Sequence, residues 1–477
     1  MEDIPAAIEP ACPGCRALKA ELELQRATIA TLLERVRQLE ARLGQDSSNS
    51  SQPPSSDPPW KARPKRKPGG GRRGGSPGHP GQTRELLPEP ELTELVEYRP
   101  ERCPCGVELG RVPVTEGLAP RRHQVWDRPV PQPVVVEHRC CAKVCPRCGP
   151  ASWGELPPGV PRTGQGPGLE ATIGLLTGVF RMSRGNAAQL LREVWGIPIC
   201  KATVSQVERR LTTALAAPLQ AIAAALGRAG TLHVDETSWF EGGKRLWLWM
   251  AVSARAVICR IDPERSREAF GRLLGLQDGK PGGPDPPRLV TDRYGAYLRW
   301  PADRHQHCNG HILRDLEGAA ERGAAGAAFA RDRLKEAFGH WQRFKRGEID
   351  RATLQRDPAA VQQGLRAALR QGESQGDRKF RGLCRTLQAA WGRMWVYLDV
   401  EGVEPTNNAA EQAIRAAVLW RKTSYGSQSE RGRRYAEAML SVTHTARKNG
   451  INVLNFLTEA SQAAVTRSPA PLLIRTP

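Results

Sequence analysis

The chain has 477 residues, of which 39% are hydrophobic, and its 70 Lys and Arg against 50 Asp and Glu give a net charge of +20. So large a positive surplus favours nucleic acid as a partner, because each neutralised phosphate releases a condensed counterion. No stretch reaches the roughly 18 uninterrupted apolar residues of a membrane span, and the acidic N-terminus lacks the apolar core of a secretory signal. We therefore expect a multidomain cytoplasmic protein whose 12 cysteines serve as metal ligands before disulfides.

The first predicted element is a coiled coil over residues 15–44. Its apolar positions alternate spacings of four and three, which is a heptad seam interrupted only by Gln25. β-branched residues at a positions with Leu at d positions favour a parallel two-stranded coil, so we expect a homodimer. The alternative is one amphipathic helix that lies against the protein's own body. The seam consists of Leu18, Leu22, Gln25, Ile29, Leu32, Val36, Leu39 and Leu43.

Residues 45–94 are predicted to be a disordered basic linker. The first part is rich in Ser, Pro, Gly and Asn and has almost nothing to bury. A basic tract follows, and such a tract can track phosphates or enter a minor groove, although a solvated linker with incidental charge is the alternative. The predicted DNA-binding residues of this tract are Lys61, Arg63, Lys65, Arg66, Lys67, Arg72 and Arg73.

Residues 95–155 contain two close cysteine pairs, each followed by Gly, which predicts two knuckles around one structural Zn²⁺. The first pair is the tighter C-x-C, and either Cys140 or Cys141 could replace a ligand. Free structural thiols are the alternative. Between the pairs, residues 132–138 have the pattern of a strand. The four predicted zinc ligands are Cys103, Cys105, Cys145 and Cys148.

Residues 160–228 are predicted to form a helical domain that resembles a helix-turn-helix. The expected helices cover 168–181, 184–195 and 203–215, with Ser183 as an N-cap and Gly196 ending the second helix. In such a motif the start of the second helix contacts base edges. An ordinary helical hairpin is an equal alternative. The residues placed for base contact are Lys201, Thr203 and Gln206.

From residue 229 the pattern changes to strands that end in carboxylates. Asp235 ends the first strand, Asp292 ends a later one, and Glu411 lies on a helix that opens near Thr406. Three convergent carboxylates suit two divalent cations that act on a phosphodiester. Alternatively, strand-end Asp residues cap turns or form ion pairs. The residues that share a helix face with Glu411 and are predicted to contact phosphate are Asn407, Asn408 and Arg415.

Three stretches together, His233 to Thr237, Thr291 to Tyr297 and Thr406 to Glu411, resemble the DDE transposases of the sixty-six group of bacterial insertion sequences. The leucine heptads, the polar linker and the cysteine segment extend this resemblance over nearly the whole chain. It implies a multidomain α+β protein whose RNase H-like catalytic domain spans 229–318 and 399–460. A helical insertion would occupy 319–398, and a tail 461–477.

The resemblance also implies roles for the acids. Asp235, Asp292 and Glu411 would be the catalytic residues and would bind the Mg²⁺ or Mn²⁺ cofactor, while Zn²⁺ would be structural. A bacterial, nucleoid-associated location follows from the same likeness.

Further basic residues are candidates for phosphate contact. His311 and Arg314 lie in a C-x2-H-x2-R pattern and are expected to face phosphate or to orient a catalytic carboxylate. Arg421 and Lys422 are expected to contact DNA as well. In the helical insertion, a basic face is either a DNA contact or a solvated surface; it comprises Arg331, Arg333, Lys335, Arg343, Lys345 and Arg346.

The expected function is that of a transposase that binds insertion-sequence ends and catalyses metal-dependent DNA cleavage and strand transfer. Its partners would be the element ends and target DNA, together with a second copy of the chain and accessory proteins. One alternative is a catalytically inactive regulator that binds DNA through the coiled coil and zinc segment. Another is a nuclease of the same fold that cuts without joining.

Overall fold

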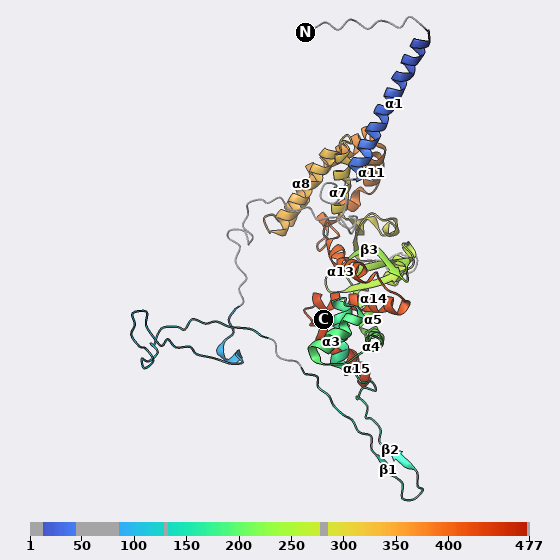
Figure 1. Ribbon diagram of the computed structural model, residues 1–477. Coiled ribbons are helices and arrows are strands. Elements are labelled where there is room, and N and C mark those ends of the chain that lie inside the picture. The colour runs from blue at the N-terminus through green and yellow to red at the C-terminus, as the bar shows by residue number, and fades with distance from the viewer. Residues whose placement is uncertain (1–12, 44–84, 128–131, 277–284, 475–477) are drawn as a thin grey trace. The chain divides into compact units, whose positions relative to one another are not determined.

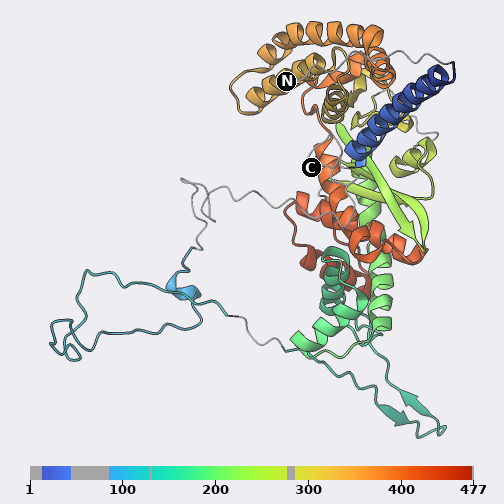
Figure 2. The ribbon, with the colours of Figure 1, turned by 45° about the horizontal axis from the view of Figure 1, so that its top comes forward.

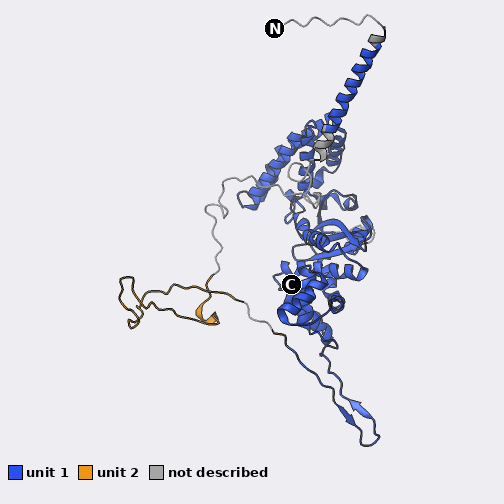
Figure 3. Ribbon diagram, viewed as in Figure 1, with its two compact units in different colours: residues 1–59, 133–477 blue, residues 60–132 orange. Residues whose placement is uncertain are grey.

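A computed structural model describes residues 13–43, 85–127, 132–276 and 285–474. The chain divides into two compact units, residues 60–132 and the remainder (Figure 3). The predicted basic tract, Lys61 to Arg73, lies outside the described residues. None of the helices in the described ranges combines the length and apolar character that a bilayer crossing requires.

The N-terminal helix α1, Pro13–Leu43, is continuous over the predicted heptads (Figure 1). From Leu18 to Val36 its apolar seam is open to solvent: Leu18 is 72% exposed, Ile29 56% and Leu32 59%. The prediction of a helix is confirmed. Pairing with a second copy stays a prediction, and the exposed seam is the surface that such pairing would bury.

The second cysteine pair sits in a short hairpin. Strand β1, Ala142–Val144, pairs antiparallel with β2, Ala151–Trp153, on either side of Cys145 and Cys148. The strand predicted over 132–138 is wrong: this segment is extended but belongs to no sheet. Its valines are exposed, and β propensity alone does not make a strand where no partner backbone supplies hydrogen bonds.

The helical domain follows the predicted pattern closely. Helices α3, Arg184–Trp195, and α4, Lys201–Ala214, pack on each other through a small apolar cluster that includes Leu191 and Val204. The Ser183 side chain accepts a hydrogen bond from the Asn186 N–H, and Gly196 ends α3 with a φ of 66°. These caps confirm the predicted bounds of α3. The flanking helices are α2, Pro167–Gly174, its π-helical continuation Leu175–Val179, and α5, Ala216–Gly227.

A five-stranded mixed sheet forms the centre of the larger unit (Figure 2). The strand order is β5-β4-β3-β6-β7: the first three strands are antiparallel, and β6 and β7 run parallel to β3. β6 pairs with the first part of β3, with His233 opposite Val290, so Asp235 in the middle of β3 lies beside the carboxyl end of β6. The strands are β3 Thr231–Glu241, β4 Lys244–Val252, β5 Val257–Asp262, β6 Arg288–Thr291 and β7 His305–His307.

Helices cover this sheet and supply its core. Helix α13, Asn408–Ser424, packs on β3 and β4, and α14, Glu430–Lys448, packs on β5. Val234, Ile414 and Met439 are buried in the shared apolar core. Helix α6, Arg267–Leu274, also contacts β4 and β5, whereas α15, Val453–Thr466, packs on α2, α4 and α14.

Polar side chains of α14 cover the outer edge of the sheet. Successive turns of α14 present oxygen atoms to alternate N–H groups of the edge strand β5, so these groups are not left open to another strand. The bonds run from Val257 N to Thr445 Oγ1 (3.0 Å), from Cys259 N to Ser441 Oγ (2.8 Å) and from Ile261 N to Glu437 Oε1 (2.6 Å).

Between β7 and α13 the chain is helical, as predicted for the insertion. These helices enclose their own apolar core, which includes Leu334, Leu365 and Phe380. The six basic residues of the predicted face all form ion pairs with acidic side chains, which favours a solvated face over a DNA contact. The helices are α7 Asn309–Glu321, α8 Ala327–Lys345, α9 Arg351–Arg356, α10 Pro358–Gln375, α11 Arg378–Ala389 and α12 Val396–Asp399.

Candidate functional site

Three acids from three elements meet at the carboxyl end of β6. Asp235 lies on β3, Asp292 directly follows β6, the parallel neighbour of β3, and Glu411 lies in the first turn of α13. Burial raises the pKa of the Asp235 carboxyl well above its ordinary value, and the charges of Glu236, Asp292 and Glu411 raise it further. The acids singled out from the sequence therefore lie within electrostatic reach of one another.

Asn407 holds the start of α13 against the sheet. Its Nδ2 donates a hydrogen bond to the backbone oxygen of Val234 (2.8 Å), one residue before Asp235. Its backbone N–H donates to the sulfur of Cys308 (3.2 Å). The side chain is fully buried, so the predicted phosphate contact of Asn407 is wrong. Asn407 instead fixes where Glu411 stands relative to Asp235.

Backbone and side-chain bonds also fix the loop that carries Asp292. The Asp292 Oδ1 atom accepts a hydrogen bond from the Tyr294 N–H (2.8 Å). The backbone N–H of Cys308 donates to the Thr291 oxygen (2.7 Å), which ties the end of β7 to the end of β6. The sequence analysis did not predict β7, because three residues are too short to show a strand period.

Glu236 is a fourth acid at the site, and the sequence analysis gave it no role. Its carboxylate accepts two hydrogen bonds from the Arg265 guanidinium, at 2.6 and 2.9 Å, and another from the Tyr297 hydroxyl. Burial raises the pKa of Glu236, the charge of Asp292 adds to this, and the bonds from Tyr297 and Arg265 oppose it. Arg265 in turn lies over the ring of Tyr294, 4.1 Å from its centroid. The sequence signal that could have pointed to Glu236 is its position next to Asp235 on the same predicted strand.

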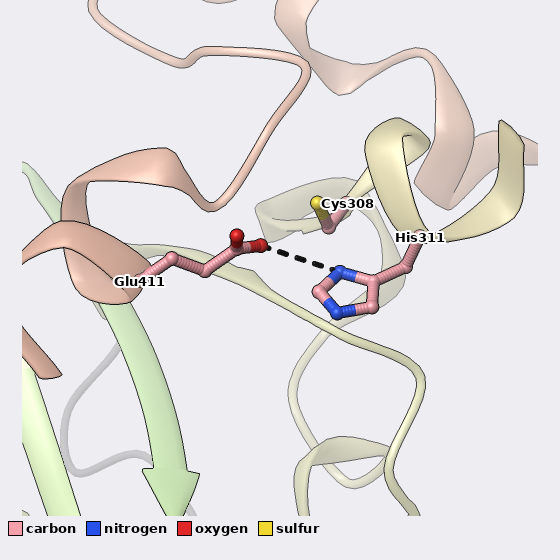
Figure 4. A group of neighbouring side chains, drawn as sticks. All are labelled: Cys308, His311 and Glu411. Atoms are coloured by element: carbon pink, nitrogen blue, oxygen red, sulfur yellow. Dashed lines mark ion pairs between the residues drawn. The ribbon is translucent and has the colours of Figure 1, made fainter. Parts of the chain in front are cut away.

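A second set of potential ligands shares Glu411. The donor atoms of Cys308, His311 and Glu411 all lie within 4.8 Å of one another, and together they could hold a metal ion. Figure 4 shows His311 Nδ1 directed at Glu411 Oε1, 3.5 Å away. Among the described residues, Cys308, His311 and Glu411 are the group of three potential ligands whose donor atoms lie this close together. Asp235 and Asp292 do not belong to this group. His311 thus lies beside a carboxylate, one of its two predicted positions.

The predicted zinc ligands fall in both units of the chain. Cys103 and Cys105 belong to the unit of residues 60–132, and Cys145 and Cys148 to the other. Each pair sits in a tight turn, closed by a hydrogen bond from Gly106 N to Cys103 O (2.8 Å) and from Gly149 N to Cys145 O (3.0 Å). Both glycines have a positive φ, 97° and 88°, where a side chain would be strained. The turns have the form of knuckles, and the shared zinc ion stays a prediction.

The predicted DNA contacts differ in accessibility. At the start of α4, Lys201 and Gln206 are exposed, whereas Thr203 is half-buried, with its hydroxyl 3.3 Å from the sulfur of Cys200. Arg421 differs from prediction: its guanidinium bonds to Thr237 Oγ1 (3.2 Å) and to Ser238, which ties the end of α13 to β3. The other candidates reach solvent at least in part; they are Arg314, Asn408, Arg415 and Lys422.

Comparison with protein families decides the relationship of the chain. The model of the transposase IS66 family matches residues 179–435, just over half of the sequence. The chain belongs to the transposase IS66 family. A family of unknown function, DUF6444, matches residues 7–85. A search of curated proteins finds no match.

The segment matched by the IS66 transposase model contains all five strands of the central sheet and the acids Asp235, Asp292 and Glu411. It ends at residue 435, within α14. The family relationship therefore covers the site itself.

Proposed function

We propose that this chain is a DDE transposase that binds the ends of its element and catalyses metal-dependent 3′-end cleavage and strand transfer. The observation that carries the proposal is the arrangement of the acids: Asp235 lies on β3, Asp292 follows the adjacent parallel strand β6, and Glu411 lies in the first turn of α13, which Asn407 ties to β3. Membership of the IS66 family supplies the reaction class. The strand order β5-β4-β3-β6-β7, three antiparallel and two parallel, supports an RNase H-like fold for the catalytic domain.

The acids fit a divalent metal centre. Buried like charges repel one another, and a bound cation reverses that cost. Carboxylate oxygens are ligands that Mg²⁺ and Mn²⁺ prefer, so Asp235, Asp292 and Glu411 would hold these ions. When bound, the ions would stabilise the attacking and leaving oxygens of an in-line displacement at phosphorus.

The surrounding residues keep the acids in place for two successive displacements. First, a water oxygen attacks the phosphodiester at the element end, the bond to the 3′ oxygen breaks, and a 3′ hydroxyl is left. That hydroxyl then attacks the phosphorus of a target phosphodiester, which joins the element end to the target, breaks the target's own bond between phosphorus and the 3′ oxygen, and leaves a target 3′ hydroxyl. Asn407 holds Glu411 beside β3, and Glu236, fixed by Arg265 and Tyr297, keeps the neighbouring part of β3 rigid.

Other elements would bind DNA and join subunits. The exposed Lys201 and Gln206 at the start of α4 suit base or phosphate contact, and the basic tract suits the DNA backbone. The cysteine turns would hold structural Zn²⁺. The exposed seam of α1 would pair two subunits, so that one assembly engages two element ends.

The test is cleavage of labelled DNA that carries the element's own ends, with Mg²⁺ or Mn²⁺. We expect Asp235→Asn to lower the cleavage rate by at least roughly 100-fold, as for loss of one charge-stabilising group, with end binding retained. Asp303→Asn is the matched control, because Asp303 is 80% exposed and lies outside the site. Cleavage by Asp235→Asn at the wild-type rate would exclude this site.

A further inference from the structure

We propose that Cys308, His311 and Glu411 form a Zn²⁺ site that inhibits the enzyme by withdrawing Glu411 from the catalytic acids. The inhibition rests on the proposed function, whereas zinc binding does not. The site would be a regulatory one, separate from the predicted structural zinc at the cysteine turns and from the ions at the catalytic acids.

The donor set suits zinc. One sulfur, one imidazole nitrogen and one carboxylate oxygen within 4.8 Å of one another are the ligand types that Zn²⁺ binds, and three protein ligands leave a fourth position for water. Mg²⁺ prefers oxygen ligands alone. His311 Nδ1 is a buried atom for which the described residues provide no hydrogen-bond partner. It therefore has a free lone pair or proton directed at Glu411 (Figure 4).

Local structure prepares the site. Cys308 is the N-cap of α7 and His311 lies in its first turn, and residues at these two positions face each other across the first turn of a helix. The backbone N–H of Asn407, at the start of α13, donates to the Cys308 sulfur at 3.2 Å. On zinc binding the thiol proton passes to solvent, and the resulting thiolate is stabilised by this N–H and by the helix terminus.

Glu411 links the two sites. Its Oε1 lies 3.5 Å from His311, yet its charge also acts on Asp235. Coordination to zinc together with Cys308 and His311 would hold the carboxylate on the α7 side and neutralise it. The catalytic acids would then lack the third carboxylate that they need.

The binding test is equilibrium dialysis of the full-length protein against Zn²⁺, followed by measurement of bound metal. We expect wild type to bind about one zinc ion per chain more than Cys308→Ser, the stoichiometry of a single three-ligand site. His311→Gln gives a second comparison if Cys308→Ser does not fold, as judged by circular dichroism. Cys384→Ser is the control, because Cys384 is buried in the separate core of the helical insertion and should bind zinc like wild type. Equal zinc content in wild type and in both site variants would overturn the proposal.

The inhibition test compares Mg²⁺-supported cleavage with and without Zn²⁺ within each protein. We expect the ratio of the cleavage rate with Zn²⁺ to the rate without Zn²⁺ to fall below one in wild type and to stay near one in Cys308→Ser. Equal inhibition of both proteins would mean that zinc acts at another site, and bound zinc without inhibition in wild type would overturn the competition for Glu411. If wild type cleaves no DNA under any condition, the proposed function fails while dialysis still decides whether zinc binds.

Discussion

Asn407 shows how a single buried amide can fix the geometry of an acid four residues away. Its side chain joins α13 to β3 beside Asp235, and its backbone joins α13 to Cys308. Glu236 has the corresponding role on the strand, where Arg265 and Tyr297 bind its carboxylate. At the scale of residues, the acids are held in place by hydrogen bonds between residues that lie far apart in the sequence.

Replacing Asn407 tests this positioning role. We expect Asn407→Ala to lower the free energy of unfolding by about 1–3 kcal/mol, because the buried Val234 oxygen loses its donor. Cleavage should slow while DNA binding is retained, since Glu411 would no longer be fixed. Gln412→Ala is the control, because Gln412 is exposed on the same helix. Denaturant unfolding and single-turnover cleavage give both readouts, and equal stability of the two variants would refute the role.

At the scale of elements, α14 closes the edge of the central sheet with a polar stripe. Side chains one turn apart bind alternate N–H groups of β5, and burial of Glu437 raises the pKa of its carboxyl to about 7. Arg433, Arg260 and Arg434 oppose this rise only in part. The polar stripe thus covers the sheet edge, and its buried carboxyl makes the stability of the fold depend on pH.

Glu437 makes stability depend on pH. A carboxyl with a pKa of about 7 in the folded state and 4.5 when unfolded favours the protonated folded form. The stability that protonated Glu437 adds to the folded state is fully present below pH 4.5 and is lost as the pH rises through 7. We expect Glu437→Gln, which keeps an acceptor for Ile261 N, to remove this fall in the free energy of unfolding.

The measurement is urea unfolding between pH 4.5 and 8. The control is Glu459→Gln, an exposed acid on α15, which should follow wild type. A wild-type profile in Glu437→Gln would contradict the assignment.

At the scale of the whole molecule, we propose that the exposed heptad seam of α1 pairs with a second copy of the chain. Leu32 lies on the seam and Leu33 beside it, and both are more than half exposed. We expect Leu32→Glu to halve the mass measured by light scattering, because a buried charge disrupts the a/d core. Leu33→Glu should leave the mass unchanged. A monomeric wild type, or equal masses for both variants, would exclude a dimer through α1.

Much of this organisation was predictable from the sequence because it depends on local signals. Ser183 and Gly196 mark the bounds of α3, and Asp292 directly follows a strand as predicted. The predicted strand end at Asp235 is wrong, because β3 continues to Glu241 in a ladder with β4. The burial of Asn407 and the half-buried position of Arg421 were not predictable, because both depend on β3, more than 150 residues away in the chain. The group of Cys308, His311 and Glu411 likewise arises only when α7 and α13 pack together.

In the proposed function, Glu411 completes a metal-dependent site for DNA cleavage and joining. The most direct measurement is strand transfer of labelled element ends into target DNA with Mg²⁺ or Mn²⁺, for wild type and Glu411→Gln. We expect joined products from wild type and none from Glu411→Gln, although both proteins bind the ends. Joining by Glu411→Gln at the wild-type rate would contradict the proposed function, as would wild-type protein that binds its cognate ends but never cleaves them.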